Sequence, residues 1–332
     1  MVVLLVLAAL IAVGVLYQTA GGYLDSRWHP APGQIVDIGC ARLHVHEQGS
    51  GRPVVVLESG IAASSLSWAL VQPKIAEFTR VCSYDRAGLG WSGKCSTPRT
   101  IEQMVSELSQ LLSHLAMPGP YILVGHSFGG LLIRAYAYLN PEQVSGLVFL
   151  DPVSVQHWAN CDTKERQRLE TGVNLSRRGA LLARFGIVRL ALSVLASGGR
   201  RFPKLVAHMT ANRGAKVMEG LAGEIRKLPP EVWPAVRAHW SRSKCFAAMA
   251  MYMEGLPENA RRALSMPIPA QIPSVILSAS NATEAELSER DSWVKQGSRT
   301  QHIRLKECGH WVQLERPGVV VDAVRGLIRR AE

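Results

Sequence analysis

The sequence predicts a domain built on a mostly parallel α/β sheet, interrupted by a large helical insertion and preceded by an apolar N-terminal helix. Three features carry this prediction. Strand-like and helix-like segments alternate over residues 54–150, a strand pattern resumes at Ser274 after a long stretch without strands, and residues 1–17 carry no charged side chain. The chain has 332 residues, 47% of them hydrophobic, which is enough to bury a substantial core.

The N-terminal segment reads "MVVLLVLAALIAVGVLY" and continues with only mild polarity to Tyr23. At 1.5 Å per residue, an apolar helix of about 20 residues matches the roughly 30 Å hydrocarbon core of a bilayer. The segment lacks the basic start and the small-residue cleavage motif of a secretory signal. We therefore predict an uncleaved, single-pass membrane anchor over residues 1–22; a cleaved signal, giving a secreted or periplasmic protein, is the alternative. The side of the membrane stays open, because Arg27 lies beyond the segment and no charged side chain precedes it.

A linker containing Pro and Gly, residues 23–34, leads into the first part of the sheet domain, residues 35–152. Alternating apolar and polar residues indicate half-buried strands, short apolar runs indicate buried strands, and apolar residues three or four positions apart indicate helices. The expected elements are, in order, a hairpin in "QIVDIGCARLHVHEQG", a strand in "RPVVVLESG", a strand over 80–84, a helix over 101–115, a strand over 121–124, a helix over 129–139 and a strand over 146–150.

The pattern changes over residues 153–270, which we predict to form a helical cap inserted into the sheet domain, since no strand pattern occurs there. The second part of the sheet domain follows over residues 271–332. It contains a strand in "IPSVILSAS", a helix, a short strand in "TQHIRLKECGHW" and a closing helix over 315–330. Sites in parallel α/β sheets form at the carboxyl ends of the strands, so we expect the functional site there.

The net charge of +11 arises in the predicted cap, where 19 Lys and Arg residues outnumber 8 Asp and Glu residues between Pro152 and Ala270. This segment has no Lys/Arg-rich run and no zinc-finger or RNP-like pattern, which argues against nucleic-acid binding. The six cysteines lack CxxC or zinc-ligand spacing, so we expect buried or free thiols and leave a structural disulfide open. No metal or organic cofactor is implied.

Catalytic chemistry is indicated first by Gly125-His126-Ser127-Phe128-Gly129, which lies between an expected strand and an expected helix. Gly-x-Ser-x-Gly in this context is typical of a nucleophile elbow, a strained turn that lifts the serine hydroxyl out of the sheet. We predict Ser127 as the nucleophile. The backbone N–H of Phe128, near the positive end of the following helix, is the first expected oxyanion donor.

A serine hydroxyl is a poor nucleophile without a general base. His310, in "CGHWVQLERP", lies in the loop between the last expected strand and the closing helix, and it is the predicted base. His126 is adjacent to the nucleophile in the sequence, but its side chain should point away from the serine. We interpret His126 as structural support.

These motifs resemble those of the α/β-hydrolase superfamily. The sequence is most similar to the superfamily's bacterial, membrane-anchored branch of serine hydrolases through "LHVHEQGSGRPVVVLESG", "VCSYDRAGLGWS", "LVGHSFGG" and "CGHWVQLERP", which follow one another in order within roughly residues 35–330. The resemblance implies an α/β-hydrolase fold with a helical cap, and a catalytic triad in the chain order serine, acid, histidine.

The acid of this triad is where the sequence departs from the superfamily's commonest pattern. The usual position, just after the strand over 274–279, holds "SNAT", and Glu284 is the first carboxylate. Asp151 instead ends the preceding strand, a position from which some members supply the acid. We predict Asp151, with Glu284 as the alternative, and Asp291 or no acid also open.

The second oxyanion donor is expected in the loop after the "VVVLESG" strand, where the superfamily usually has His-Gly and this chain has "SG" at 59–60. Because the donor is a backbone N–H, the changed side chain need not affect it. Ile61 is the predicted donor, with Ala62 open. Asp85 and Arg86, in "SYDRAGLGWS", are interpreted as structural supports for neighbouring loops.

We therefore expect a serine hydrolase that cleaves carboxylic esters through an acyl-enzyme. The same triad serves amidases, thioesterases, lactonases and acyltransferases, and a non-catalytic ligand-binding homologue is a further alternative. Serine at position 127 argues against epoxide hydrolase and dehalogenase chemistry, which needs a carboxylate nucleophile there. The apolar cap and the anchor favour a lipophilic acyl ester delivered from the bilayer. Candidate acyl-pocket residues are Trp158, Trp233, Trp240, Met249, Met251 and Met253.

Overall fold

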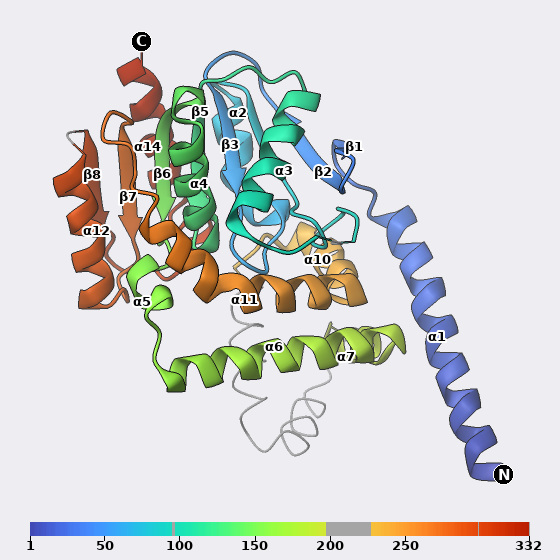
Figure 1. Cartoon of the computed structure of the whole chain (residues 1–332). Coiled ribbons are helices and arrows are strands. Elements are labelled where there is room, and N and C mark those ends of the chain that lie inside the picture. Colours follow the sequence, from blue (N-terminus) through green and yellow to red (C-terminus); the bar gives the residue numbers. More distant parts are fainter. Residues whose placement is uncertain (95–96, 197–226, 298, 332) are drawn as a thin grey trace.

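The computed structural model describes residues 1–94, 97–196, 227–297 and 299–331. Its eight-stranded sheet has the strand order β1-β2-β4-β3-β5-β6-β7-β8 (Figure 1). The β1–β2 and β2–β4 pairs are antiparallel and all other neighbouring pairs are parallel, which confirms the predicted mostly parallel sheet. The strands are β1 (Gln34–Asp37), β2 (Arg42–Gln48), β3 (Val54–Glu58), β4 (Val81–Tyr84), β5 (Tyr121–His126), β6 (Val144–Leu150), β7 (Ser274–Ser278) and β8 (Thr300–Arg304).

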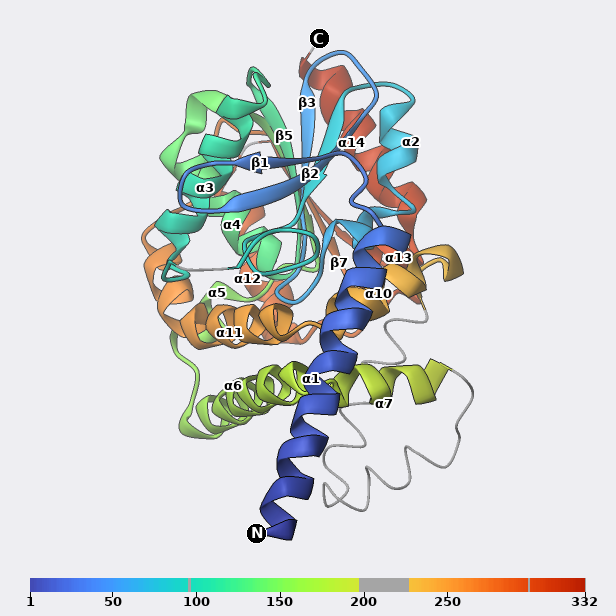
Figure 2. The same cartoon turned by 90° about the vertical axis from the view of Figure 1, so that its right-hand side faces the viewer.

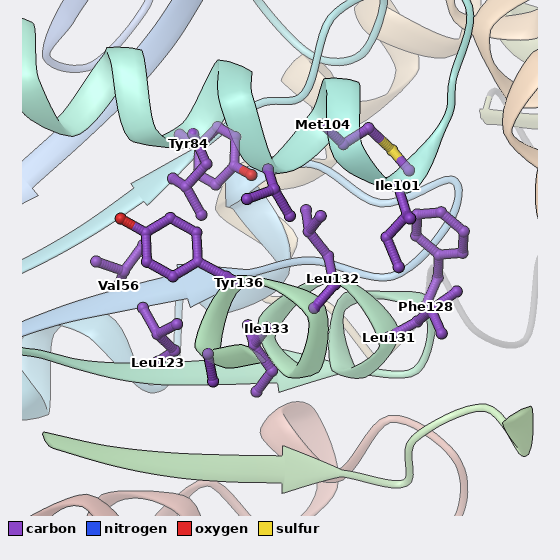
Figure 3. Packing of buried hydrophobic residues seen from close by; sticks show 14 of the residues in the cluster. Val56, Tyr84, Ile101, Met104, Leu123, Phe128, Leu131, Leu132, Ile133 and Tyr136 are labelled. Carbon is purple, nitrogen blue, oxygen red and sulfur yellow. The ribbon is translucent and has the colours of Figure 1, made fainter. Parts of the chain in front are cut away.

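Helices cover both faces of the sheet, and each face has its own apolar core (Figure 2). One core, part of which Figure 3 shows, includes Leu108, Leu132 and Trp293 from three different helices. The core on the other face includes Ile75 and Val324. The helices of the first face are α3 (Ile101–His114), α4 (Phe128–Leu139) and α12 (Glu284–Gln296), and those of the second are α2 (Gln72–Ala76) and α14 (Pro317–Ala331).

The local sequence accounts for these elements. All five residues of β3 are buried, as expected of a strand covered on both faces. In α3, the Thr100 side chain accepts a hydrogen bond from the backbone N–H of Gln103 and caps the helix. Ile101, Leu108 and Leu112 then bury one face of that helix at helical spacing. Every strand and helix predicted for the two parts of the sheet domain is present, with ends that differ by a few residues.

Between β6 and β7 the described part of the chain contains helices and no strand, as predicted for residues 153–270. These helices lie against the carboxyl ends of the parallel strands (Figure 1). Residues 197–226 of the predicted cap lie outside the described residues, and its exact boundaries stay a prediction. The helices are α5 (Val155–Ala159), α6 (Thr163–Arg184), α7 (Ile187–Ala196), α10 (Trp233–Trp240) and α11 (Ser243–Leu264).

The N-terminal segment forms one long helix, α1 (Val2–Trp28), which extends beyond the predicted anchor into the range predicted as a linker. Its mean hydropathy reaches 2.4 over 18 residues, and none of those residues is buried. The first turns project away from the rest of the molecule (Figures 1 and 2). A helix of this length and composition is suited to crossing a bilayer, and a signal sequence has the same properties.

Four of the described cysteines are free thiols: Cys82, Cys161, Cys245 and Cys308. Burial raises the pKa of three of them, to about 12 for Cys82 and about 11 for Cys245 and Cys308. These three side chains are therefore uncharged near neutral pH and behave as small apolar groups. Residue 95, the sixth cysteine, lies outside the described residues.

Replacement of His239, in α10, by phenylalanine is expected to make the protein less sensitive to acid. His239 is 4% exposed, and its ring lies edge-on to that of Trp91 with 4.4 Å between the ring centroids. Neither ring nitrogen has a hydrogen-bond partner among the described residues. Burial lowers the pKa of His239 from 6.5 to about 3. Between these two values the unfolded chain binds a proton that the folded protein does not, so the free energy of unfolding falls as the pH falls.

Urea denaturation of the detergent-solubilised protein at pH 7.5 and at pH 5 measures this effect. Between the two pH values, wild type should lose about 2 kcal/mol more unfolding free energy than His239→Phe, because one pKa unit corresponds to about 1.4 kcal/mol. His114→Phe, at an exposed histidine in the last turn of α3, is the matched control and should behave as wild type does. Equal losses in wild type and His239→Phe would contradict a buried, neutral His239.

Candidate active site

The turn between β5 and α4 consists of Ser127 alone. Its backbone angles, φ 54° and ψ −116°, lie in a region that residues with side chains rarely occupy. Two hydrogen bonds hold this conformation: the Ser127 N–H donates to the carbonyl of Leu150 at 2.9 Å, and the Ser127 carbonyl accepts from the N–H of Gly130 at 2.9 Å. The surrounding backbone therefore imposes a strained conformation on one serine, as the pentapeptide predicts.

The glycines on either side of Ser127 are required by close packing of the backbone. A Cβ atom on Gly125 would lie 2.6 Å from the carbonyl oxygen of Gly129. A Cβ atom on Gly129 would lie 2.3 Å from the carbonyl oxygen of Glu58, at the end of β3. Any side chain at either position would force the strand and the helix apart. The motif thus permits a turn too tight for other residues.

His310 and Asp151 lie in contact beside this turn. The Nδ1 atom of His310, in the loop after β8, is 2.6 Å from Oδ2 of Asp151, the residue that follows β6. The His310 side chain is 43% exposed and that of Asp151 is 9% exposed, so a buried carboxylate holds a ring that solvent can reach. No hydrogen bond joins the Ser127 hydroxyl to the His310 ring within the described part of the chain. Such bonds are often long in ligand-free sites and tighten when substrate binds.

Both carboxylate oxygens of Asp151 accept hydrogen bonds. Oδ2 accepts from His310, and Oδ1 accepts from the backbone N–H of Ala279 at 3.1 Å and from Nη1 of Arg290 at 2.9 Å. Burial alone would raise the pKa of Asp151, but the hydrogen bond to His310 and the charge of Arg290 outweigh it and lower the pKa. Asp151 is therefore ionised at neutral pH and oriented from two sides.

Arg290, on α12, is a residue of this site that sequence reasoning missed. It is 2% exposed, and it also donates to Ser278 Oγ and to the carbonyl of Pro152, each at 2.8 Å. Arg290 thereby links Ser278, the last residue of β7, to Pro152, the residue that follows Asp151 at the end of β6. No motif marks Arg290, because it lies in the middle of a helix that is rich in polar and charged residues. A buried arginine becomes apparent there only from the packing of α12.

The other carboxylates considered for the triad lie elsewhere. Glu284 is exposed at the first turn of α12 and has no contact with His310. Asp291 pairs with His302 at 2.6 Å and with Arg304 at 2.7 Å. Of the three candidates, the structure brings only Asp151 to His310.

The two predicted oxyanion donors border Ser127. Phe128 is the first residue of α4, so its backbone N–H has no carbonyl partner within the helix. Ile61 lies in the turn after β3, which is closed by a 3.2 Å hydrogen bond from the Ala63 N–H to the Gly60 carbonyl. A Cβ atom on Gly60 would lie 3.7 Å from the Ser127 Cβ, which shows how close this turn is to the nucleophile.

Arg86 holds the turn that carries Ile61. It is 4% exposed and pairs with the buried carboxylate of Glu58. Its guanidinium also donates to the carbonyl of Ser59 at 2.6 Å and to that of Gly60. The Gly60 carbonyl and the Ile61 N–H belong to one planar peptide unit, so this contact sets the direction of the predicted donor. The interpretation of Arg86 as a loop support agrees with these contacts.

Asp85 is buried in a structural network. It accepts hydrogen bonds from Nδ1 of His44 at 2.9 Å, from the Ser65 N–H at 2.7 Å and from the Trp91 N–H at 2.9 Å. The other ring nitrogen of His44 faces the carbonyl of Pro32. Burial lowers the pKa of His44, but Asp85 outweighs it and raises the pKa. With its carboxylate used in this way, Asp85 supports the loops and is unavailable as a nucleophile.

The His126 side chain contacts the loop that carries His310. It is 1% exposed, and its Nε2 atom is 2.9 Å from the backbone carbonyl of His310. Since a carbonyl can only accept, Nε2 carries the proton. Burial, aided by the charge of a protonated His310, lowers the pKa of His126 to about 3. His126 is thus a neutral donor that positions the loop of the predicted base.

The suggested acyl-pocket residues lie on three helices of the insertion: Trp158 on α5, Trp233 and Trp240 on α10, and Met249, Met251 and Met253 on α11. Trp158 packs against the core that α3 and α4 share, while Trp233 is 40% exposed. Trp240 contacts Phe246 at 5.4 Å between ring centroids. One side chain of the insertion that contacts the elbow is Tyr252 of α11, whose ring centroid lies 5.9 Å from that of Phe128. No metal-binding cluster of His, Cys, Asp or Glu occurs among the described residues.

Comparison with known proteins gives the following likenesses. A family model described as "Alpha/beta hydrolase family" matches residues 54–323. The chain is 37% identical over 114 residues to uncharacterized protein YqjL of Bacillus subtilis, covering 34% of this chain and 45% of that protein. It is 36% identical over 111 residues to Lipase LipV of Mycobacterium tuberculosis, covering 33% of this chain and 41% of that protein.

The chain thus spans less than half the length of these two curated relatives. Among solved structures, that of a thermophilic esterase from Thermogutta terrifontis matches with a TM-score of 0.59 and 22% identity, covering 90% of this chain and 98% of the esterase. At 22% identity, this likeness supports a shared fold and says nothing about a shared activity.

Proposed function

We propose that this chain, which belongs to the alpha/beta hydrolase family, is a serine hydrolase that cleaves carboxylic esters. The observation that carries the proposal is the contact of His310 Nδ1 with Asp151 Oδ2, at 2.6 Å, beside the strained turn of Ser127. The proposed nucleophile, base and acid follow the carboxyl ends of three different strands, which is where sites form in parallel α/β sheets.

In the proposed reaction the Ser127 Oγ attacks the acyl carbon while Nε2 of His310 takes the hydroxyl proton. Asp151 accepts the Nδ1–H of the ring, which fixes the tautomer and stabilises the imidazolium as it forms. His310 then gives the proton to the leaving alcohol, and the acyl group stays on Ser127. A water molecule, deprotonated by His310, attacks the acyl-enzyme, and the carboxylic acid leaves as Ser127 regains its proton.

Negative charge develops on the carbonyl oxygen in both tetrahedral intermediates. The backbone N–H groups of Phe128 and Ile61 are proposed to donate to that oxygen, and the positive end of α4 adds to the stabilisation. Rigid donors are effective because they need no rearrangement as the charge forms. Arg86 supplies this rigidity for Ile61 through its contact with the Gly60 carbonyl.

Arg86→Lys is therefore expected to lower kcat by about 10- to 100-fold, with little change in KM. Lysine keeps the positive charge beside Glu58 but lacks the planar fork that holds two carbonyls at once. Steady-state kinetics with a p-nitrophenyl ester measure the effect. Tyr84→Phe is the matched control, because Tyr84 donates to the same Glu58 carboxylate without touching the turn. If both variants lose kcat equally, the effect comes from the Glu58 cluster and not from the Ile61 donor.

Lipophilic acyl esters are the substrate class that we propose. The helical insertion covers the catalytic edge of the sheet, and α1 is proposed to anchor the protein to a membrane, from which such substrates would be supplied. A serine nucleophile can also cleave amides, thioesters and lactones, or transfer an acyl group to an alcohol. We rank these four activities behind ester hydrolysis. A non-catalytic ligand-binding protein is the remaining alternative.

Incubation of the detergent-solubilised full chain with a fluorophosphonate probe and with p-nitrophenyl esters tests the proposal. Labelling together with ester turnover supports it. Partition of the acyl group to an added alcohol in preference to water would identify an acyltransferase instead. Absence of both labelling and turnover would favour the non-catalytic alternative.

A further inference from the structure

We propose that the last turn of α6, together with α7, lies in the interface of the bilayer that α1 enters, so that the helical insertion rests on the membrane. The partner is a lipid bilayer. The inference depends on the membrane anchor of the proposed function and adds a second, separate contact surface. Three observations support it: how α1 is attached, which part of α1 meets the insertion, and what α6 and α7 expose.

Helix α1 is attached to the insertion by a buried polar network. Arg189 of α7 is 9% exposed, and its Nη2 atom donates to Asp25 Oδ2 at 2.6 Å and to Ser241 Oγ at 2.8 Å. Its Nε atom donates to Gln18 Oε1 at 3.1 Å. Asp25 is the one buried residue of α1. An arginine held by three partners on two elements gives α1 a defined position relative to α7.

The two helices also approach closely nearer the N-terminus. A Cβ atom on Gly14 would lie 2.4 Å from the carbonyl oxygen of Phe185, between α6 and α7, and one on Gly21 would lie 2.7 Å from Nε of Arg189. Both figures show α6 and α7 running across the direction of α1 (Figures 1 and 2). If α1 crosses a bilayer, α6 and α7 therefore run along its surface.

The contact with Phe185 falls within the apolar part of α1. Residues 2–23 carry no charged side chain, and Gly14, where Phe185 makes contact, lies among them. If these residues cross a bilayer, the level of Phe185 falls at the bilayer and not in the surrounding water. An amphipathic helix at that level rests with its apolar face about 5–10 Å inside the headgroup boundary.

The surface of α6 and α7 near Phe185 has the composition that this depth requires. Four apolar side chains within two turns of Phe185 are about half exposed: Leu181 53%, Leu182 42%, Ile187 50% and Leu190 53%. Exposed Arg178 and Arg184 flank them, while Arg189 points inward to Asp25. Apolar residues bordered by arginines are typical of interfacial helices, whose cations reach the headgroups.

This placement puts the insertion between the bilayer and the proposed nucleophile. Helix α6 packs along α11, and α11 contacts the elbow through Tyr252 and Phe128. An acyl ester leaving the membrane near α7 would thus meet the insertion before it meets water. A second copy of this chain could also cover the three exposed leucines and the isoleucine, but it would not account for their place beside the apolar part of α1.

Photo-crosslinking in liposomes tests the inference without using activity. A photo-reactive amino acid replaces Leu190, Leu10 of α1 or Ser113, an exposed residue at the end of α3 that is remote from α7. The full-length variants are reconstituted in phosphatidylcholine–phosphatidylglycerol vesicles, irradiated and analysed by mass spectrometry. Phospholipid adducts are expected at positions 10 and 190 and not at 113.

Adducts at position 10 without adducts at 190 would overturn the interfacial placement and leave the anchor intact. Absence of adducts at both positions would overturn the anchor and the inference together. Crosslinks from 190 to a second copy of the chain would identify a self-association surface instead. Turnover of a soluble p-nitrophenyl ester, measured on the same samples, reports separately on the proposed hydrolase activity.

A charge-introducing variant adds a functional readout. Leu190→Asp is expected to lower turnover of an ester embedded in vesicles by about tenfold or more, because a carboxylate is costly to place among acyl chains. Turnover of a soluble ester should stay unchanged, since Leu190 is remote from Ser127 and His310. Ser113→Asp is the matched control. Equal loss on both substrates would show that the substitution disturbs the fold, and unchanged turnover on both would contradict the interfacial contact.

Discussion

Replacement of Ser127 by alanine is expected to lower ester turnover by a factor of about 10⁴ or more and to abolish labelling by a fluorophosphonate probe. The reason is chemical: alanine lacks the oxygen that forms the acyl-enzyme, and no other group replaces it at the turn. The methyl group of alanine fits the same space. The strained backbone is held by hydrogen bonds of the main chain, which the substitution leaves in place.

The measurement is the initial rate with short and medium p-nitrophenyl esters, together with gel-based detection of the labelled protein. Ser113→Ala, at an exposed position of α3, is the control and should retain full rate and labelling. A Ser127→Ala protein that is folded and hydrolyses esters at the wild-type rate would rule out the proposed nucleophile. Loss of labelling with retained turnover would point to a second hydrolytic site.

Asp151→Asn should produce the second large loss, about 10⁴-fold in kcat. Both oxygens of Asp151 accept hydrogen bonds, from His310 on one side and from Arg290 and Ala279 on the other. An asparagine has one oxygen and one NH₂ group, so one of these donors would face another donor. The His310 ring would then lose its tautomer or its orientation, and it could no longer take the proton of Ser127.

Glu284→Gln and Asp291→Asn are the matched controls for this prediction, because they neutralise the other two carboxylates considered for the triad. Both should keep kcat within about twofold of wild type, as expected for exposed surface substitutions. Circular dichroism and urea denaturation check that Asp151→Asn is folded. A collapse of activity in Glu284→Gln, with Asp151→Asn active, would assign the acid to α12 and contradict the proposal.

The residues of the elbow show how far local sequence determines this protein. Gly125 and Gly129 are needed because any Cβ atom there would collide with neighbouring backbone, and Ser127 between them is the proposed nucleophile. Such requirements act over a few residues, so they leave a recognisable motif. The strands and helices of the sheet domain were predictable for the same reason. The spacing of apolar residues within a single element shows which of its faces is buried, and therefore whether it is a helix or a strand.

The choice among the candidate acids depends on the tertiary structure. Asp151 directly follows β6, whereas Glu284 and Asp291 lie in α12, and the sequence favoured Asp151 without excluding the other two. The parallel order β6-β7-β8 brings the end of β6 to the loop after β8 and leaves α12 outside it. Asp151 and His310 come into contact because of this strand order. Which strands pair depends on the whole sheet and not on local propensity, so the sequence around each residue does not reveal the contact.

The partners of the buried arginines also depend on the tertiary structure. Arg290 on Asp151, Arg86 on the Gly60 carbonyl and Arg189 on Asp25 each join elements that are distant in the sequence. In the sequence an arginine is most simply read as a solvated surface residue, since burial of an unpaired charge is costly. Its burial becomes favourable when folding brings a carboxylate or carbonyl groups to it. Local sequence therefore determined the elements of this protein and the turn that presents the proposed nucleophile, whereas long-range packing decided which carboxylate lies on His310, the contacts that support the site and the position of α1.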